Sequence, residues 1–359
     1  MNIKEKISSF TLSTVILSLS AMSFFGIFSS YIINKTMNAS IISTIIGFIL
    51  SLLISHIILK FININSNLTF TQNVNKLFPK LGKIINTLTI ISSLSAYILI
   101  TYRLSTFLSN NYLINTPKYL ISLLTLILTF YISIKGTNAL IRISYITFFI
   151  TIINFLFDAI NLIPQINIDN YIPLIDTNIK QILTSSIIFA LYFSIPIIYI
   201  NVVPLNICQN KNDFKKNYYI MITLSFIIII TSIITCIGVS SSKLLGLFDY
   251  PIYSSLKKIK LFNTIDSLEN ISISSWFLFI INTSSLMLIH IFSSIKETFN
   301  KDSIIIKAMI ILITFIISYI INNSNYNETY NYIYIPLIPC IFTLFILIIS
   351  IIKKLLIQK

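Results

Sequence analysis

The sequence predicts an all-α integral membrane protein of about ten transmembrane helices. Hydrophobic residues make up 55% of the 359 residues and charged residues only 10%, with a mean hydropathy of +0.89. A soluble domain needs far more charge to cover its surface. Long uncharged runs are the second observation, because the segment 270–293 contains no charged residue. Each span of a hydrocarbon core of roughly 30 Å takes about 20 apolar residues.

Ten apolar runs are long enough to cross a bilayer. Lys4 and Lys6 precede the first run, and no clear small-residue cleavage site follows it. We therefore interpret this run as a retained first helix and not as a signal peptide. The predicted spans are 8–33, 39–61, 84–106, 117–134, 140–162, 182–203, 218–239, 272–292, 304–321 and 333–352.

The distribution of lysine and arginine predicts the orientation. With the N-terminus in the cytoplasm, 17 of the 25 basic residues fall on the cytoplasmic side and eight on the outside. Cytoplasmic loops of membrane proteins carry the excess of basic residues. Both termini are therefore expected in the cytoplasm. The same rule explains the net charge of +14 without a nucleic-acid partner.

Ten spans divide into two halves of five, and an odd number per half makes the second half enter the bilayer from the opposite face. We expect a single domain, 1–359, with inverted repeats at about 8–162 and 182–352, an arrangement found in many secondary transporters. In such folds the first helix of each half is interrupted. Gly26 and Pro196 are helix breakers inside spans one and six. Their positions predict interruptions in both spans.

A small solute is expected to bind where the two interrupted helices meet. A simple kink without a ligand is an equally good interpretation of Gly26 and Pro196 alone. Tyr97 and Thr101 lie four residues apart on one face of span three. Ligand contact and an interhelical hydrogen bond are equal alternatives for them. The candidate ligand-binding residues are Ala21, Met22, Ser23, Phe25, Gly26, Tyr97, Thr101, Tyr192, Ser194 and Pro196.

Other polar residues in the spans have two interpretations each. The stretch 282–285 in span eight favours helix–helix contacts over sodium coordination. Arg103 and Asp158 are expected to face water at the outer ends of their helices, with an ion pair between them as the alternative. For His56 and His290, a position at the membrane interface or a single hydrogen bond is favoured over a proton relay.

The sequence contains no catalytic constellation. It has no GxSxG, HExxH, Walker or DxD motif, and its acidic residues lie mostly in loops. The three cysteines, Cys208, Cys236 and Cys340, have no metal-binding spacing. We therefore predict that the protein is not an enzyme and uses no cofactor and no metal.

Several short motifs, in order along nearly the whole chain, resemble the endospore germination permease family, the B subunit of the spore nutrient-germinant receptor. Some positions differ from the family pattern, including Ala21, Phe28, Asn138, Asn178 and Ser267. The matching motifs are Leu81-Gly82-Lys83, Tyr97, Tyr102-Arg103, Thr116-Pro117, the turn from Gly136 to Arg142, Tyr171-Ile172-Pro173, Tyr250-Pro251, Phe262, Asp266, Leu268-Glu269 and Trp276.

The resemblance implies an amino acid/polyamine/organocation permease fold, which is LeuT-like, and a place in the inner membrane of the spore. It also implies A and C subunits as partners in a receptor complex. Such a subunit binds a small nutrient, often an amino acid, and triggers germination. The five-plus-five pattern alone supports the alternative of a stand-alone amino-acid secondary transporter.

Overall fold

The computed structural model describes residues 6–259, 269–323 and 331–357. The motif residues Phe262, Asp266, Ser267 and Leu268 lie outside this part of the chain. The helices are α1 Ser9–Ser23, α2 Ser29–Thr36, α3 Ser40–Ile62, α4 Phe70–Leu77, α5 Gly82–Asn111, α6 Lys118–Lys135, α7 Thr137–Leu162, α8 Ile179–Ser194, α9 Lys211–Ser240, α10 Ser242–Leu245, α11 Pro251–Leu256, α12 Glu269–Phe299, α13 Ile304–Asn323 and α14 Asn331–Ile357.

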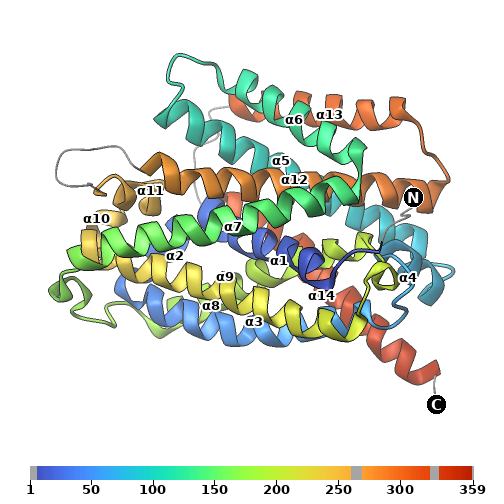
Figure 1. Ribbon diagram of the computed structural model, residues 1–359, viewed down its shortest axis with the longest axis horizontal. Helices are drawn as coiled ribbons and strands as arrows, with labels where there is room; N and C mark the ends of the chain where they lie inside the picture. Colours follow the sequence, from blue (N-terminus) through green and yellow to red (C-terminus); the bar gives the residue numbers. More distant parts are fainter. Residues whose placement is uncertain (1–5, 260–268, 324–330, 358–359) are drawn as a thin grey trace.

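The long helices run roughly parallel or antiparallel to one another in a single bundle (Figure 1). Both termini and α4 lie at one end, which we call the inner end. The short helices α10 and α11 lie at the opposite, outer end. Two backbone hydrogen bonds hold the start of the chain at the inner end, from the Ile7 amide to the Ile207 carbonyl and from the Gln209 amide to the Ile7 carbonyl, both 3.0 Å.

Nine helices of the described residues are long and apolar enough to cross a membrane. The predicted span that is missing from this count is span one, 8–33. A change from α-helix to π-helix divides it into two short pieces, α1 and α2. Its first piece is apolar but short, and its second piece is counted together with α3 as one segment, Ser29–Ile62. The chain turns back between these two helices at Met37, which has a φ of 43°. The ten predicted spans therefore all coincide with helical segments.

Both predicted interruptions occur at the expected residues. Between α1 and α2, the segment Phe24–Phe28 around Gly26 is π-helical. After α8, the chain continues as a 3-10 helix, Ile195–Val202, with Pro196 in its first turn. Proline removes an amide donor and clashes with the preceding turn, which explains the end of the α-helical pattern there. The backbone stays helical at both places, so the interruptions are changes of helical pitch and not extended segments.

The interrupted first helix is at the centre of the bundle. The helix α1 packs against α7, α9 and α12, while α3 packs along α8 and α12 packs along α5. At the periphery, α13 buries only Thr314 and Ser318. Its large apolar side chains, such as Ile305 and Leu312, are exposed. A helix that exposes most of its large apolar side chains is typical of a surface that contacts lipid. The chain is thus a multi-pass membrane protein.

Candidate functional site

A cavity of about 50 Å³ lies between the two interrupted helices. A single water molecule needs about 10–15 Å³ of cavity volume. The central cavity therefore has room for a few non-hydrogen atoms. The described residues that line it carry no formal charge. They come from α1, α5, α8 with its 3-10 extension, α12 and α14, and are Met22, Ser92, Ala96, Leu99, Ile100, Tyr192, Ile195, Pro196, Tyr199, Thr283, Met287, Pro339 and Cys340.

Three of the predicted site residues line this central cavity. Met22 lies at the end of α1, just before the π-helical segment. Tyr192 belongs to the last turn of α8, and its ring stacks on Phe28 with 6.1 Å between ring centroids. Pro196 begins the 3-10 segment. The structure thus brings these three residues together at one cavity.

Three other predicted residues make helix–helix or intrahelical bonds instead. The Tyr97 hydroxyl lies 2.7 Å from the Thr129 hydroxyl of α6. Thr101 donates to the Tyr97 carbonyl, 2.8 Å away. Ser194 donates to the Ser51 carbonyl of α3 at 3.1 Å. None of the three lines the central cavity. For Tyr97, the interhelical hydrogen bond is the alternative that the structure supports.

The remaining predicted residues lie around the π-helical segment. Ala21 is fully buried but does not line the central cavity. Gly26 lies within the segment itself, and Ser23 is the last residue of α1 before it. Phe25 lines a different, outer cavity. Met22, just before the segment, therefore lines the central cavity, whereas Phe25, inside the segment, lines the outer one.

The outer cavity has a volume of about 70 Å³ and lies between α7, α9, α12 and the short helix α11. The Asp158 carboxylate of α7 lines it and accepts a hydrogen bond from the Ser272 hydroxyl of α12. No ion pair joins Arg103 and Asp158 in the part of the chain that the structure describes, and Arg103 is only 3% exposed, so the expectation that it faces outer water is wrong. The Arg103 guanidinium carbon lies 5.1 Å from the centroid of the Tyr250 ring.

Two stacked aromatic rings line the outer cavity, close in sequence to residues that line the central one. Met22 lines the central cavity, and Phe25 lines the outer one three residues later. On α12, Phe279 lines the outer cavity, and Thr283 lines the central one a turn further along. The rings of Phe25 and Phe279 stack with 6.4 Å between their centroids. The two cavities share no lining residue among those described.

The polar stretch of α12 makes helix–helix contacts, the interpretation that its sequence favours. The Asn282 amide donates to the Ser18 hydroxyl of α1 at 3.3 Å and to the Thr147 hydroxyl of α7 at 3.0 Å. Thr283 donates to the Ser18 carbonyl at 3.3 Å. Among the described residues, no three His, Cys, Asp or Glu side chains are grouped closely enough to hold a metal ion.

The two histidines lie apart, in different surroundings. His56 bonds the Tyr219 hydroxyl at 3.0 Å. His290 is buried, with its ring 5.0 Å from that of Tyr199 and 5.8 Å from that of Phe70. Since Tyr199 lines the central cavity, His290 supports the wall of this site, which the sequence prediction did not include.

The sequence prediction missed most of the wall that α5, α12 and α14 contribute. On α5 it chose Tyr97, whereas the neighbouring Ala96 and Ile100 line the central cavity. An apolar helix gives no sequence signal for which of its faces meets a cavity. The exception is α14, where Pro339 next to Cys340 is a helix breaker in the sequence, although α14 is α-helical over Asn331–Ile357.

Comparisons with known proteins agree with this architecture. The family described as spore germination protein matches residues 6–327. A crystal structure of a mutant manganese transporter from Eremococcus coleocola is similar in fold, with a TM-score of 0.61 and 14% sequence identity over 86% of this chain and 68% of that chain. Comparison with curated proteins finds no matching sequence. The fold is thus that of a LeuT-like transporter, and the chain belongs to the spore germination permease family.

Proposed function

We propose that this protein is the permease-like subunit of a spore nutrient-germinant receptor, and that a small nutrient bound in the central cavity triggers germination. The observation that supports this most directly is the cavity between the two interrupted helices, lined by Met22, Tyr192 and Pro196, in a chain of the spore germination family. The absence of formal charge among its described lining residues suits a small neutral or zwitterionic nutrient, such as an amino acid.

A population shift would convert binding into a signal. A nutrient that binds one arrangement of the interrupted helices better than another increases the population of that arrangement. The first helix is suited to transmit the change, because α1 packs against α7, α9 and α12. In this proposal the motion passes to A and C subunits in the inner membrane of the spore, with both termini of this chain in the cytoplasm.

Substitution of Pro196 tests the site. In spores whose own copy is deleted and replaced by Pro196→Ala, the helix regains a backbone donor and the cavity wall changes shape. We expect the nutrient concentration for half-maximal germination to shift about three- to tenfold, equivalent to ~0.7–1.4 kcal/mol. The measurement is the loss of optical density of the spore suspension against nutrient concentration, with receptor abundance determined by immunoblot.

Tyr97→Phe is the matched control. It removes the hydroxyl that bonds Thr129 and leaves the residues lining the central cavity unchanged. Thr129 also donates to the Thr125 carbonyl at 2.9 Å, so it keeps a partner. Spores with Tyr97→Phe should respond at the wild-type concentration. If Pro196→Ala receptors are present at normal abundance and also respond at that concentration, the nutrient binds elsewhere.

A stand-alone amino-acid transporter is the second candidate, favoured by the fold shared with a manganese transporter. The two functions differ in the step after binding. A transporter reconstituted alone into liposomes accumulates a labelled amino acid, whereas a receptor subunit requires its A and C partners for a response. Uptake by the isolated chain at rates sufficient for nutrition would favour the transporter.

A further inference from the structure

The outer cavity has one charged group in its wall and many aromatic rings. Of the described residues that line it, only Asp158 carries a formal charge. Ser272 is the only hydrogen-bond partner of this carboxylate among the described residues. A carboxylate with a single hydroxyl partner in a mostly apolar wall favours a cation beside it, because an uncompensated charge away from water is costly.

The hydroxyl groups of this wall act as donors within their own helices. Thr151 donates to the Thr147 carbonyl at 2.8 Å, Ser232 to the Ile228 carbonyl at 2.8 Å, and Ser275 to the Ser272 carbonyl at 2.7 Å. A hydroxyl that has donated its proton keeps two lone pairs that accept. The polar part of the wall therefore offers mainly acceptors, which suits a ligand that carries several N–H donors.

The aromatic rings provide a surface that attracts cations. Six ring-bearing residues besides Phe25 line the cavity: Phe107, Phe155, Tyr250, Tyr253, Trp276 and Phe279. Two of them already attract cations of the chain itself. The Lys257 ammonium lies 4.5 Å from the Tyr253 ring centroid, and the Arg103 guanidinium carbon 5.1 Å from that of Tyr250. Ring faces carry negative electrostatic potential, which stabilises a desolvated ammonium group.

We propose that the outer cavity binds a small primary ammonium ion, with the Asp158 carboxylate as its counter-ion and the aromatic rings as its wall. The volume of about 70 Å³ admits about five to seven water-sized groups at 10–15 Å³ each. A short alkylammonium ion fits this space. The site is distinct from the proposed nutrient site, with which it shares no described lining residue.

The chemistry of the wall also distinguishes between two sources of an ammonium group. A free amine has one charge, which Asp158 neutralises. An amino acid also carries a carboxylate, for which the described lining residues offer no cationic group. The outer cavity should therefore prefer a simple amine over a zwitterion.

Trp276 makes the test direct, because it is the only tryptophan in the chain and lines this cavity. The purified full chain in detergent is titrated with ethylammonium chloride at mildly alkaline pH, where the amine keeps its proton. We expect a saturable change in tryptophan emission. Ethanol, which has nearly the same size and no charge, sodium chloride at equal ionic strength and alanine should give at most a weak change at the same concentrations.

Two variants assign the binding to the wall. Asp158→Asn should weaken ethylammonium binding about thirtyfold or more, because the charge partner in the cavity wall is lost. Phe155→Leu keeps an apolar side chain one turn from Asp158 but removes a ring face, and should weaken binding about threefold. Asp169→Asn is the matched control, since this exposed residue loses the same charge outside the cavity. Its titration should equal that of the wild type.

Several results would overturn the proposal. They are a wild-type titration without saturation, an equal response to ethanol, sodium or alanine, or unchanged binding by Asp158→Asn. The assay measures binding to the isolated chain and not germination. A negative result therefore leaves the nutrient site untouched, and a misplaced nutrient site leaves this result untouched.

Discussion

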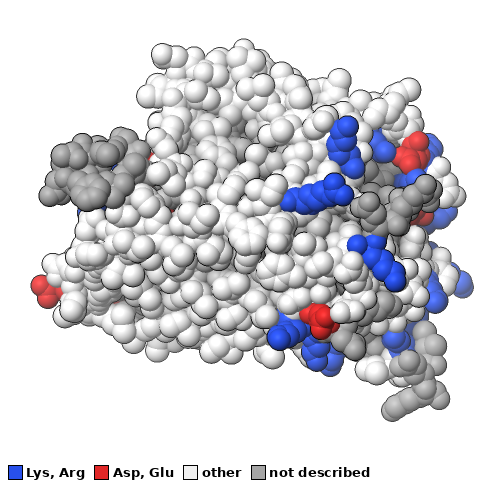
Figure 2. Space-filling view, in the orientation of Figure 1, with Lys and Arg blue, Asp and Glu red and all other residues white. Residues whose placement is uncertain are grey.

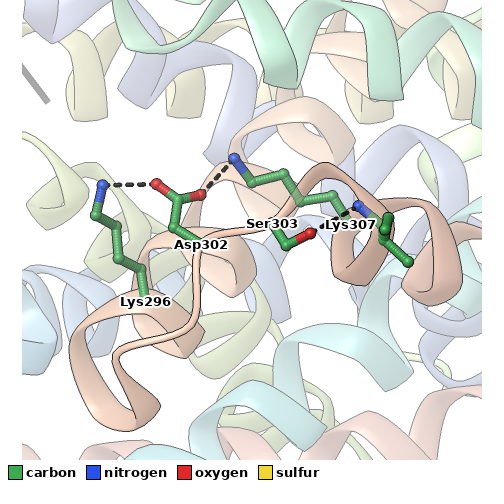
Figure 3. A network of polar contacts seen from close by, with 5 residues as sticks. Lys296, Asp302, Ser303 and Lys307 are labelled. Carbon is green, nitrogen blue, oxygen red and sulfur yellow. Dashed lines mark hydrogen bonds and ion pairs between the residues drawn. The ribbon is translucent and has the colours of Figure 1, made fainter.

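Asp302 joins two helices at the inner end of the bundle. Its carboxylate oxygens lie 2.6 Å from the Lys296 ammonium of α12 and 2.8 Å from the Lys307 ammonium of α13 (Figure 3). The adjacent Ser303 hydroxyl accepts from the Ile305 amide at 3.2 Å in the first turn of α13. The connection between the two helices is thus fixed by charge on one side and by a helix cap on the other.

The two lysines lower the pKa of Asp302 to about 2, mainly through their hydrogen bonds to its carboxylate. A depressed carboxyl pKa contributes stability above its unfolded value of about 3.9, and this contribution is lost as the pH falls towards about 2. Because the pair is largely exposed, Asp302→Asn should cost at most ~1 kcal/mol. Thermal unfolding in detergent should show a small decrease in Tm at neutral pH that disappears in high salt.

Asp213→Asn serves as the control for this ion pair. Asp213 is also at the inner end, but its partner is the Asn210 amide at 3.0 Å. Asp213 also lies in the first turn of α9, where its interaction with the helix dipole is a small contribution. Its substitution should therefore lower Tm less than Asp302→Asn does. A decrease in Tm for Asp302→Asn that persists at high salt would contradict an electrostatic origin.

Individual residues show where sequence reasoning reaches its limit. Pro196 was predictable because its chemistry alone ends an α-helix. Tyr97 was not, since its hydroxyl requires a partner in either interpretation. Only the position of Thr129 on α6 decides that the partner is another helix.

At the scale of elements, α3 and α8 pack closely because of one glycine. A Cβ atom on Gly47 would lie 2.7 Å from Phe189 Cδ1 and 2.8 Å from the Ser186 carbonyl oxygen. Small residues at such contacts allow helix backbones to approach in a membrane. Gly47→Ala should destabilise the protein by ~1–3 kcal/mol, because the backbone of α8 cannot yield locally. The decrease is measured as Tm in detergent.

Gly246→Ala is the control for this close contact. Its nearest neighbour would be the Asn34 side-chain oxygen at 2.9 Å, which can rotate away. The effect should remain within ~0.5 kcal/mol. Equal effects of the two substitutions would show that the α3–α8 contact has no special role.

The helical elements were predictable from length and hydropathy, and so were the positions of the two interruptions. Their form was not. Gly26 predicted a loosened helix, but not a π-helical segment, whose ends Phe24 and Phe28 pack against Phe189 with ring centroids 6.3 Å and 5.8 Å away. Those contacts bring together residues distant in sequence, so no local pattern contains them.

For the molecule as a whole, the distribution of charge is the feature that the sequence and the fold share. On the face drawn in Figure 2, lysine and arginine side chains gather at the inner end, near α4 and both termini. Seventeen of the 25 basic residues were assigned to that side from the sequence. The excess at this end agrees with a cytoplasmic inner end.

Cysteine labelling tests this orientation. In a background without Cys208, Cys236 and Cys340, a single cysteine replaces Asp169 in the 163–178 loop or Lys301 between α12 and α13, both exposed. In intact bacterial cells that express the protein, a membrane-impermeant maleimide should label Asp169→Cys. It should label Lys301→Cys only after lysis, because an excess of basic residues favours the cytoplasmic side. A permeant maleimide should label both in intact cells, and the reverse pattern with the impermeant reagent would place the termini outside.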